Sequence, residues 1–277
     1  MEQQQDNQIA TGHPRLRPSG FTPNQGRHMS SRSGRGPRFG GDGSTAPPKV
    51  PQNQILSKLP SEEFARLQEH ASEAQFGLRD ELFEPGDTLE RVYFPLNVMF
   101  SLINVLEDGT AVEVMTVGRE GFVGFTLLNE VSTARYKGMC QIAGTSLTME
   151  AKKFLVLIEK MPDLRRRLRR YGQFANEVAA QSVACNSVHN VEQRLARWLL
   201  VTGDAVDSKT FDITQEFLSQ MLAVRRAGVT NAMGSLERRA LLEHRYGKVT
   251  LQDVEGLKKT SCECYRTIRE KASELLD

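Results

Sequence analysis

Two short helix patterns separated by a tight corner occupy residues 213–242, and no other segment constrains the fold as strongly. Each pattern repeats its apolar residues at i, i+3 and i+4, so each helix would bury one stripe. The apolar positions are Phe217, Leu218, Met221 and Leu222 in the first pattern and Val229, Ala232, Met233 and Leu236 in the second. Arg225 and Arg226 stand at the start of the second helix. This arrangement is typical of a helix-turn-helix, whose second helix enters the major groove of duplex DNA.

Helix pairs of this kind also occur in all-α proteins that bind no DNA, so the pattern alone leaves both interpretations open. The next segment, residues 241–251, favours DNA. Its two apolar runs and the turn Tyr246-Gly247-Lys248 predict a β-hairpin. A hairpin behind a helix pair forms a wing, on which Arg245 and Lys248 would lie near phosphates and position the protein without reading sequence.

The distribution of charge supports the same interpretation. The 277 residues include 36 Lys+Arg and 34 Asp+Glu, a net charge of only +2, which by itself does not indicate nucleic acid. Residues 213–250, however, carry six basic side chains against Glu216, Glu237 and Glu243. A locally basic module on a nearly neutral body is the electrostatic signature of a DNA-binding protein.

The amino-acid composition of the N-terminal half changes near residue 50. Residues 1–48 hold eight of the 22 Gly, six of the 11 Pro and six Arg, which predicts a disordered tail. A basic arm that adds non-specific affinity for DNA is the alternative. Residues 50–160 begin with a short helix within 50–72 and continue as a β domain. Its expected short strands lie at 82–87, 92–94, 98–106, 111–117, 139–142 and 146–149. Many short strands at this spacing predict a double-stranded β-helix or jelly roll within an α+β protein.

One long helix is expected over residues 162–189, where apolar residues alternate steps of four and three. The series is Leu164, Leu168, Tyr171, Ala175, Val178, Ser182, Cys185 and His189. Such a heptad pattern predicts the coiled-coil seam of a homodimer. Packing of a single helix on its own domain is the alternative. A further helix over 191–201, a linker over 202–209 and a last helix over 251–276 complete a predicted winged domain, residues 191–275. The last helix would pack on the winged module or on the partner subunit.

The four cysteines, at 140, 185, 262 and 264, show no CxxC pair and no Cys/His cluster with metal-ligand spacing. On one continuous last helix, Cys262 and Cys264 would face different directions and could not hold one metal ion. We therefore expect no metal site and free thiols in a reducing cytoplasm. No apolar run reaches about 18 residues, so no membrane span is expected. No Ser/His/Asp set or phosphate-cradling loop stands out, so we expect no catalytic residues and no enzyme.

Taken in order, these parts resemble the Crp/Fnr family of bacterial transcription regulators, over about residues 50–275. The resemblance rests on Glu84-Pro-Gly-Asp87, Asp108-Gly109, Gly118-Arg-Glu-Gly-Phe-Val-Gly124, Val191-Glu-Gln-Arg-Leu-Ala-Arg-Trp198 and the module at 213–242. It implies a cyclic-nucleotide-binding-type β-roll, a dimerisation helix and a C-terminal winged helix-turn-helix. It also implies three partners, namely double-stranded DNA, a second copy of the chain and RNA polymerase.

The resemblance assigns roles in the DNA-binding module residue by residue. Arg226, with Arg225 beside it, falls where the family has an Arg that reads guanine, and a bidentate Arg–guanine contact discriminates by about 1–3 kcal/mol. Thr230 and Asn231 become candidate base or phosphate contacts, and Ser219 and Gln220 become backbone contacts. The family's following Glu is Ala227 here, and a later Arg is Asn231, so a different operator is expected. The corner residue, usually Gly, is Ala223, which would cost on the order of 1 kcal/mol at a positive φ.

The sensor half departs further from the cAMP-binding pattern. Those members carry Gly-Glu, with the Glu on the ribose, and later Arg-Ser, which holds the cyclic phosphate. Here Gly124 matches, Phe125 replaces the Glu, and Arg135 and Lys137 are the candidate cations without an Arg-Ser pair. Phe cannot accept from the ribose hydroxyl, so we predict no tight cAMP binding. The effector stays unidentified, no cofactor is expected, and the N-terminal cysteine cluster of iron–sulfur members is absent from the sequence.

These observations predict a homodimeric, sequence-specific DNA-binding transcription regulator with an input signal at the β-roll. The alternative is a cyclic-nucleotide-type ligand sensor or regulatory subunit whose C-terminal helices bind protein and not DNA. Binding to genomic DNA fragments, with its dependence on salt, separates the two.

Overall fold

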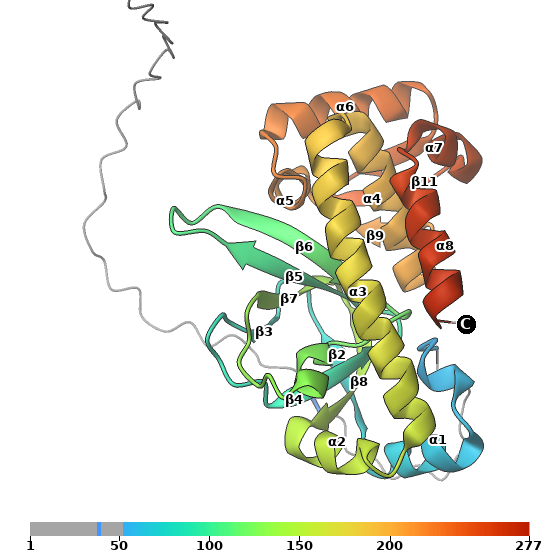
Figure 1. Ribbon diagram of the computed structural model, residues 1–277. Coiled ribbons are helices and arrows are strands. Elements are labelled where there is room, and N and C mark those ends of the chain that lie inside the picture. The colour runs from blue at the N-terminus through green and yellow to red at the C-terminus, as the bar shows by residue number, and fades with distance from the viewer. Residues whose placement is uncertain (1–37, 40–51, 277) are drawn as a thin grey trace, which may run out of the picture. The chain divides into compact units, whose positions relative to one another are not determined.

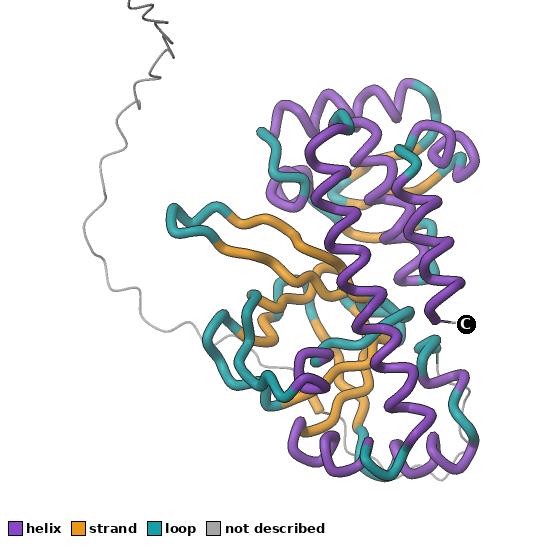
Figure 2. Tube along the Cα trace, in the orientation of Figure 1, coloured by secondary structure: helices purple, strands orange, loops and turns teal. Residues whose placement is uncertain are grey.

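The computed structural model describes residues 38–39 and 52–276 (Figure 1). Most of the predicted tail, residues 1–48, lies outside the described residues. Arg38–Phe39 is the exception, because it forms strand β1, which pairs antiparallel with the next strand. The described chain then runs through a β domain, a long helix, and a second domain in which helices surround a small sheet, as the colours of Figure 2 make clear.

Two four-stranded antiparallel sheets, with strand orders β1-β2-β8-β4 and β3-β7-β5-β6, build the β domain. Their strands are β2 (Ser72–Phe76), β3 (Glu81–Phe83), β4 (Arg91–Pro95), β5 (Met99–Val105), β6 (Ala111–Val117), β7 (Lys137–Ile142) and β8 (Gly144–Glu150). Because strands far apart in the chain lie side by side, this is the predicted jelly roll, and the α+β fold class is confirmed. Strand β2 was not predicted, since its sequence SEAQF has few apolar residues.

Four short helical segments close this domain: η1 (Leu56–Lys58), α1 (Ser61–Gln68), η2 (Phe125–Asn129) and α2 (Ala151–Ile158). Glu63 of α1 is buried and links the domain to the next helix. Its two carboxylate oxygens accept from the backbone amides of Asp163, at 3.0 Å, and Leu164, at 2.8 Å. These amides belong to the first turn of α3, where the positive end of the helix dipole favours a carboxylate.

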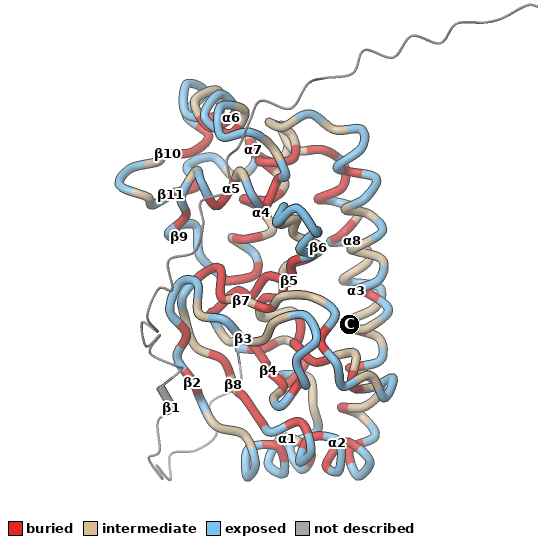
Figure 3. Tube along the Cα trace, turned by 90° about the vertical axis from the view of Figure 1, so that its left-hand side faces the viewer, coloured by how far each residue is buried: buried red, intermediate tan, exposed pale blue. Residues whose placement is uncertain are grey.

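The long helix α3 (Pro162–Val188) confirms the predicted span, but the predicted dimer seam is wrong. Leu164, Leu168, Tyr171, Ala175 and Cys185 are each at most 2% exposed within the single chain. They are covered by the β domain and by the C-terminal segment of the same chain, so they are closed to a partner. Val178 and Ser182 are half-buried on the same side. Buried and exposed positions alternate along α3 in Figure 3, and the heptad spacing therefore reports packing of α3 on its own chain.

The second domain begins with α4 (Val191–Val206), which starts at an Asn190–Gln193 capping box. Since α4 continues to Val206, the predicted linker at 202–209 is helical in its first half. Strand β9 (Thr210–Asp212), which was not predicted, joins the expected hairpin β10 (Leu242–Arg245) and β11 (Lys248–Leu251) in the order β10-β11-β9. Between them lie α5 (Gln215–Met221) and α6 (Arg226–Arg238), the two helices predicted from residues 213–242.

The predicted single last helix is wrong, because the chain breaks between α7 (Val254–Thr260) and α8 (Cys264–Leu276). Residues 261–263 are not helical. Helix α8 then returns alongside α3 of its own chain (Figure 1), so it packs on α3 as well as on the winged module that was predicted to hold it. Tyr265 packs in the core of the second domain and Ile268 in the core of the β domain. The break also removes the premise that Cys262 and Cys264 lie on one helix and face apart.

The core of the second domain reaches into the β domain. Met99 and Ile103 of β5 are at most 2% exposed and cluster with Leu199 of α4 and with α5. The junction between the two domains is therefore apolar. Among the helices that the structure describes, none is both long and apolar enough to cross a bilayer.

Candidate nucleic-acid interface and interdomain cavity

The corner between α5 and α6 is set by backbone hydrogen bonds. The amide of Val224 donates to the Ser219 carbonyl at 3.0 Å, and the amide of Ala223 donates to the Gln220 carbonyl at 3.1 Å. This pair of bonds is a Schellman motif, which requires a left-handed residue at the position of Ala223. Its φ is 49°, as anticipated for the corner, so an alanine occupies a conformation that favours glycine.

A side-chain bond fixes α6 against α5. The Thr230 hydroxyl lies 2.9 Å from Oε1 of Gln215, and 3.1 Å from the Arg226 carbonyl one turn earlier. Thr214 caps α5, because its hydroxyl accepts from the Phe217 amide at 3.2 Å. Gln215 was not singled out from the sequence, since a polar residue in a first helical turn carries no signal of a cross-helix contact.

The predicted DNA contacts of the helix pair lie on exposed positions near the start of α6. Arg225 is the N-cap residue and Arg226 the first residue of α6. The Arg226 side chain is 70% exposed, and its Nη1 lies 4.0 Å from Oε2 of Glu216. Thr230, Asn231 and Gln220 are exposed as well. Ser219 differs, because it is half-buried and its hydroxyl donates to the Glu216 carbonyl at 2.7 Å.

The wing carries a second exposed cationic group. A two-residue turn, Tyr246-Gly247, joins β10 to β11 with positive φ at both residues, 52° and 77°, as in a type I′ hairpin. Arg245 pairs with Glu243 at 2.5 Å, and Lys248 lies 4.0 Å from Asp212. Such exposed pairs contribute little, so phosphates can replace the carboxylates at small cost. Tyr246, which the sequence placed in the turn but not among the DNA contacts, is fully exposed at the tip of the wing.

The comparison with known proteins matches this geometry. Residues 193–260 match the model of the Crp-like helix-turn-helix domain. This part of the chain is therefore a Crp-like helix-turn-helix domain. No curated protein matches its sequence.

Several solved structures of other proteins share the fold over nearly their whole length. FixK2 from Bradyrhizobium japonicum is 15% identical, with a TM-score of 0.59 over 69% of this chain and 98% of that one. The c-di-GMP responsive global regulator CLP from Xanthomonas campestris is 18% identical, with a TM-score of 0.56 over 69% and 99%. TTHB099, a CRP-family transcriptional regulator from Thermus thermophilus, is 19% identical, with a TM-score of 0.51 over 73% and 98%.

The four predicted effector residues of the β domain lie in different surroundings. Gly124 begins η2 with a φ of 120° beside Val92, and the ring of Phe125 stands edge-on to Tyr171 at 6.3 Å. Phe125 therefore packs on the core and offers no polar atom. Lys137 is held by the carboxylates of Glu81 and Glu84. Arg135 is exposed.

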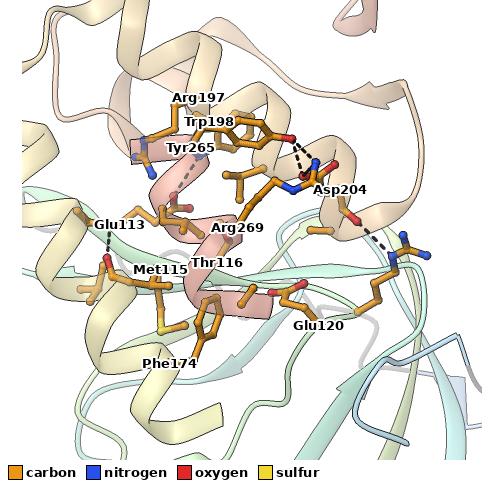
Figure 4. A pocket seen from close by; sticks show the side chains of 18 of the residues that line it. Glu113, Met115, Thr116, Glu120, Phe174, Arg197, Trp198, Asp204, Tyr265 and Arg269 are labelled. Atoms are coloured by element: carbon orange, nitrogen blue, oxygen red, sulfur yellow. Dashed lines mark hydrogen bonds and ion pairs between the residues drawn. The ribbon is translucent and has the colours of Figure 1, made fainter. Parts of the chain in front are cut away.

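A cavity of about 390 Å³ lies instead between the two domains, lined by β6, α3, α4 and α8 (Figure 4). Glu113 of β6 lines this cavity. Its carboxylate accepts hydrogen bonds from the Trp198 indole at 3.0 Å and from the Ser101 hydroxyl at 2.8 Å. Burial raises the pKa of Glu113, and these two hydrogen bonds and Arg197 oppose that shift. The bond to Trp198 joins β6 of the β domain to α4 of the second domain.

The opposite wall of this cavity is polar and also bridges elements. The Tyr265 hydroxyl donates to Oδ2 of Asp204 at 2.9 Å, and Arg269 donates to the Tyr265 oxygen at 3.1 Å. Arg119 pairs with Asp207 at 2.8 Å. Burial raises the pKa of Glu120, which lies beside them. These residues come from α8, from the C-terminal end of α4 and from the loop after β6, which only the fold brings together.

A second cavity, of about 460 Å³, opens on the β domain beside β3 and β4. Its lining includes three carboxylates, those of Glu81, Asp87 and Glu90, and one guanidinium, that of Arg91. These carboxylates make the wall of the cavity negatively charged, and a phosphate is negatively charged as well. None of the four predicted effector residues lines either cavity.

Proposed function

We propose that the chain is a homodimeric, sequence-specific DNA-binding regulator that inserts the start of α6 into the major groove. The observation that carries this proposal is the exposed Arg225–Arg226 pair at the N-terminal end of α6. In a helix-turn-helix these positions face base edges. Arg226 reads a guanine in this proposal, while Arg225, Lys248 and Arg245 contact phosphates. RNA polymerase belongs among the partners, since a regulator on its operator acts through polymerase recruitment or exclusion.

A homodimer would use the outer face of α3, because the predicted seam is buried within each chain. Val183 is 69% exposed on that face, and a side chain at Gly172 would meet open space. Ala179 and Ala180, between them, are small and allow close helix approach. Two DNA-binding domains related by this helix would read half-sites roughly 34 Å apart.

The input signal reaches the DNA-binding domain through the interdomain cavity in this proposal. A ligand between β6 and α4 would compete with the Glu113–Trp198 bond and alter how the two domains pack. Such a ligand shifts the equilibrium only by its difference in affinity for the two arrangements. We propose that it is not cAMP, since Phe125 packs on the core and the second cavity carries three carboxylates against one guanidinium.

The test is selection of genomic DNA fragments at physiological salt, followed by anisotropy titration with the selected site. Arg226→Ala should lose about 1–3 kcal/mol per half-site, and therefore about 2–6 kcal/mol for a dimer, roughly a 30-fold to 20,000-fold rise in Kd. Lys248→Ala should weaken binding to all sequences alike. Arg266→Ala is the matched control, because this arginine is 75% exposed but lies on α8.

Several outcomes decide the proposal. Sedimentation of the complex should give two chains for each operator. Wild-type affinity of Arg226→Ala would show that the register of α6 on DNA is wrong. Binding without sequence preference or salt dependence would instead favour the alternative, in which the C-terminal helices bind protein.

A further inference from the structure

Three cysteines and one histidine meet where α3 ends and α8 begins. Cys185 and His189 lie four positions apart at the C-terminal end of α3 and share one face of the helix. Cys262 lies in the break after α7, and Cys264 is the first residue of α8. One ligand atom from each of the four residues can be chosen so that all lie within 4.8 Å of one another.

The distances in this cluster are close to those of a tetrahedral metal site. Zinc binds cysteine sulfur at about 2.3 Å and histidine nitrogen at about 2.0–2.1 Å, so tetrahedral ligands are separated by about 3.5–3.8 Å. Sγ of Cys185 lies 3.6 Å from Sγ of Cys262, and Sγ of Cys264 lies 3.7 Å from Nδ1 of His189. The remaining pairs lie at most 4.8 Å apart and need to contract by at most about 1.3 Å to complete the tetrahedron.

His189 is held in the orientation that a metal ligand requires. Its Nε2 lies 3.1 Å from a carboxylate oxygen of Glu263, so Nε2–H donates outward and the lone pair of Nδ1 faces the sulfur of Cys264. A carboxylate behind a ligating imidazole fixes the tautomer and raises its basicity. The Gln181 amide also donates to Sγ of Cys264, at 3.1 Å.

The surroundings suit a buried site with negative charge. Cys185, Cys262 and Cys264 are at most 3% exposed, and the imidazole side chain is 13% exposed. Arg194, which is 7% exposed, and Arg197 lie in the first two turns of α4 and interact electrostatically with the thiols. The Nε atoms of both arginines have no hydrogen-bond partner among the described residues, so the two guanidiniums keep donors for nearby negative charge.

We propose that Cys185, His189, Cys262 and Cys264 bind one Zn²⁺ ion per chain. The three thiols release their protons to solvent, and three thiolates on Zn²⁺ leave a net charge of −1, which Arg194 and Arg197 offset. Four protein ligands close the coordination sphere, which is the arrangement of a structural and not a catalytic zinc. A cluster of several irons needs ligands farther apart, because irons and sulfides must fit between them.

The ion would fasten α8 at the hinge between the two domains. It ties the first residue of α8 to the end of α3, directly before α4. The same helix places Tyr265 in the core of the DNA-binding domain and Ile268 in the core of the β domain. Zinc binding therefore restrains the relative position of the two domains, and it does so whether or not the chain binds DNA as proposed above.

The experiment measures metal in the full chain, purified under reducing conditions. We expect one zinc per chain by elemental mass spectrometry, and its loss in Cys185→Ser and Cys264→Ser. Cys140→Ser is the matched control, because this buried cysteine lies in β7, away from the cluster, and should retain the metal. Co²⁺ added to metal-free protein should give thiolate-to-cobalt charge-transfer bands and the strong ligand-field bands of a tetrahedral site.

A variant that keeps all four ligands tests the metal site even if the cysteine variants misfold. Glu263 is 63% exposed, so Glu263→Gln should fold normally while its Zn²⁺ affinity falls about 10–100-fold in competition with a chromophoric chelator. The proposal is overturned by wild-type protein with no more zinc than Cys185→Ser, by equal loss in Cys140→Ser, or by iron in place of zinc. A Cys185–Cys262 disulfide in the reduced preparation would also overturn it.

Discussion

Replacing Ala223 with glycine should stabilise the DNA-binding domain. Ala223 has a φ of 49° because the Schellman motif at the end of α5 requires a left-handed residue there. An L-residue with a Cβ pays about 1–2 kcal/mol in that conformation. Glycine removes this strain but adds about 0.4–1 kcal/mol of unfolded-state entropy. Since Ala223 is exposed and loses no buried contact, the net gain should be about 0.5–1 kcal/mol.

The assay is denaturant unfolding of the full chain, followed by circular dichroism. Ala227→Gly is the matched control: the substitution is identical and also at an exposed position, but Ala227 is helical in α6, so glycine should cost about 0.5–1 kcal/mol. The two variants should therefore shift the unfolding midpoint in opposite directions. A midpoint that falls for both would refute the reasoning, because it would mean that the corner imposes no left-handed strain on Ala223.

Two further variants test the junctions of the β domain. Gly121→Ala should destabilise the chain by about 1–3 kcal/mol and lower Tm by roughly 2–4 °C per kcal/mol. The added Cβ would clash with the ring of the fully buried Tyr171. An unchanged Tm in calorimetry would contradict this packing. Glu113→Gln should flatten the pH dependence of stability. Burial raises the folded-state pKa of Glu113 above 4.5, so protonation of this carboxyl stabilises the folded state. This contribution is lost as pH rises through the folded pKa. The free energy of unfolding of wild type minus that of Glu113→Gln should then grow as pH falls from neutral toward 4.5, and a difference that shrinks would contradict the shift.

The helix-turn-helix was predictable because its information is local. Two apolar stripes, an arginine pair and a turn at Tyr246-Gly247 lie within 40 residues, and each follows from spacing along one element. The strand that completes the wing sheet, β9, was missed because Thr210–Asp212 is short and only one of its residues is buried.

The heptad on α3 illustrates what spacing cannot decide. Leu164, Leu168 and Tyr171 define a face that must be covered, and the sequence indicates this correctly. Whether a second chain or the same chain covers that face depends on where α8 and η2 return, and periodicity is identical in the two cases. The predicted dimer seam therefore became the internal packing face.

By itself, the sequence determined the order of the parts, the exposed arginines of α6, and the absence of the ribose-binding Glu at Phe125, since these depend on residue type and local spacing. Only the tertiary structure decided which residues share a site. The break at 261–263 turns Cys262 and Cys264 toward Cys185, 77 positions away from Cys262, and β6 meets α4 at Glu113 and Trp198. Contacts across such separations arise from how helices and sheets bury their apolar faces, which no short stretch of sequence encodes alone.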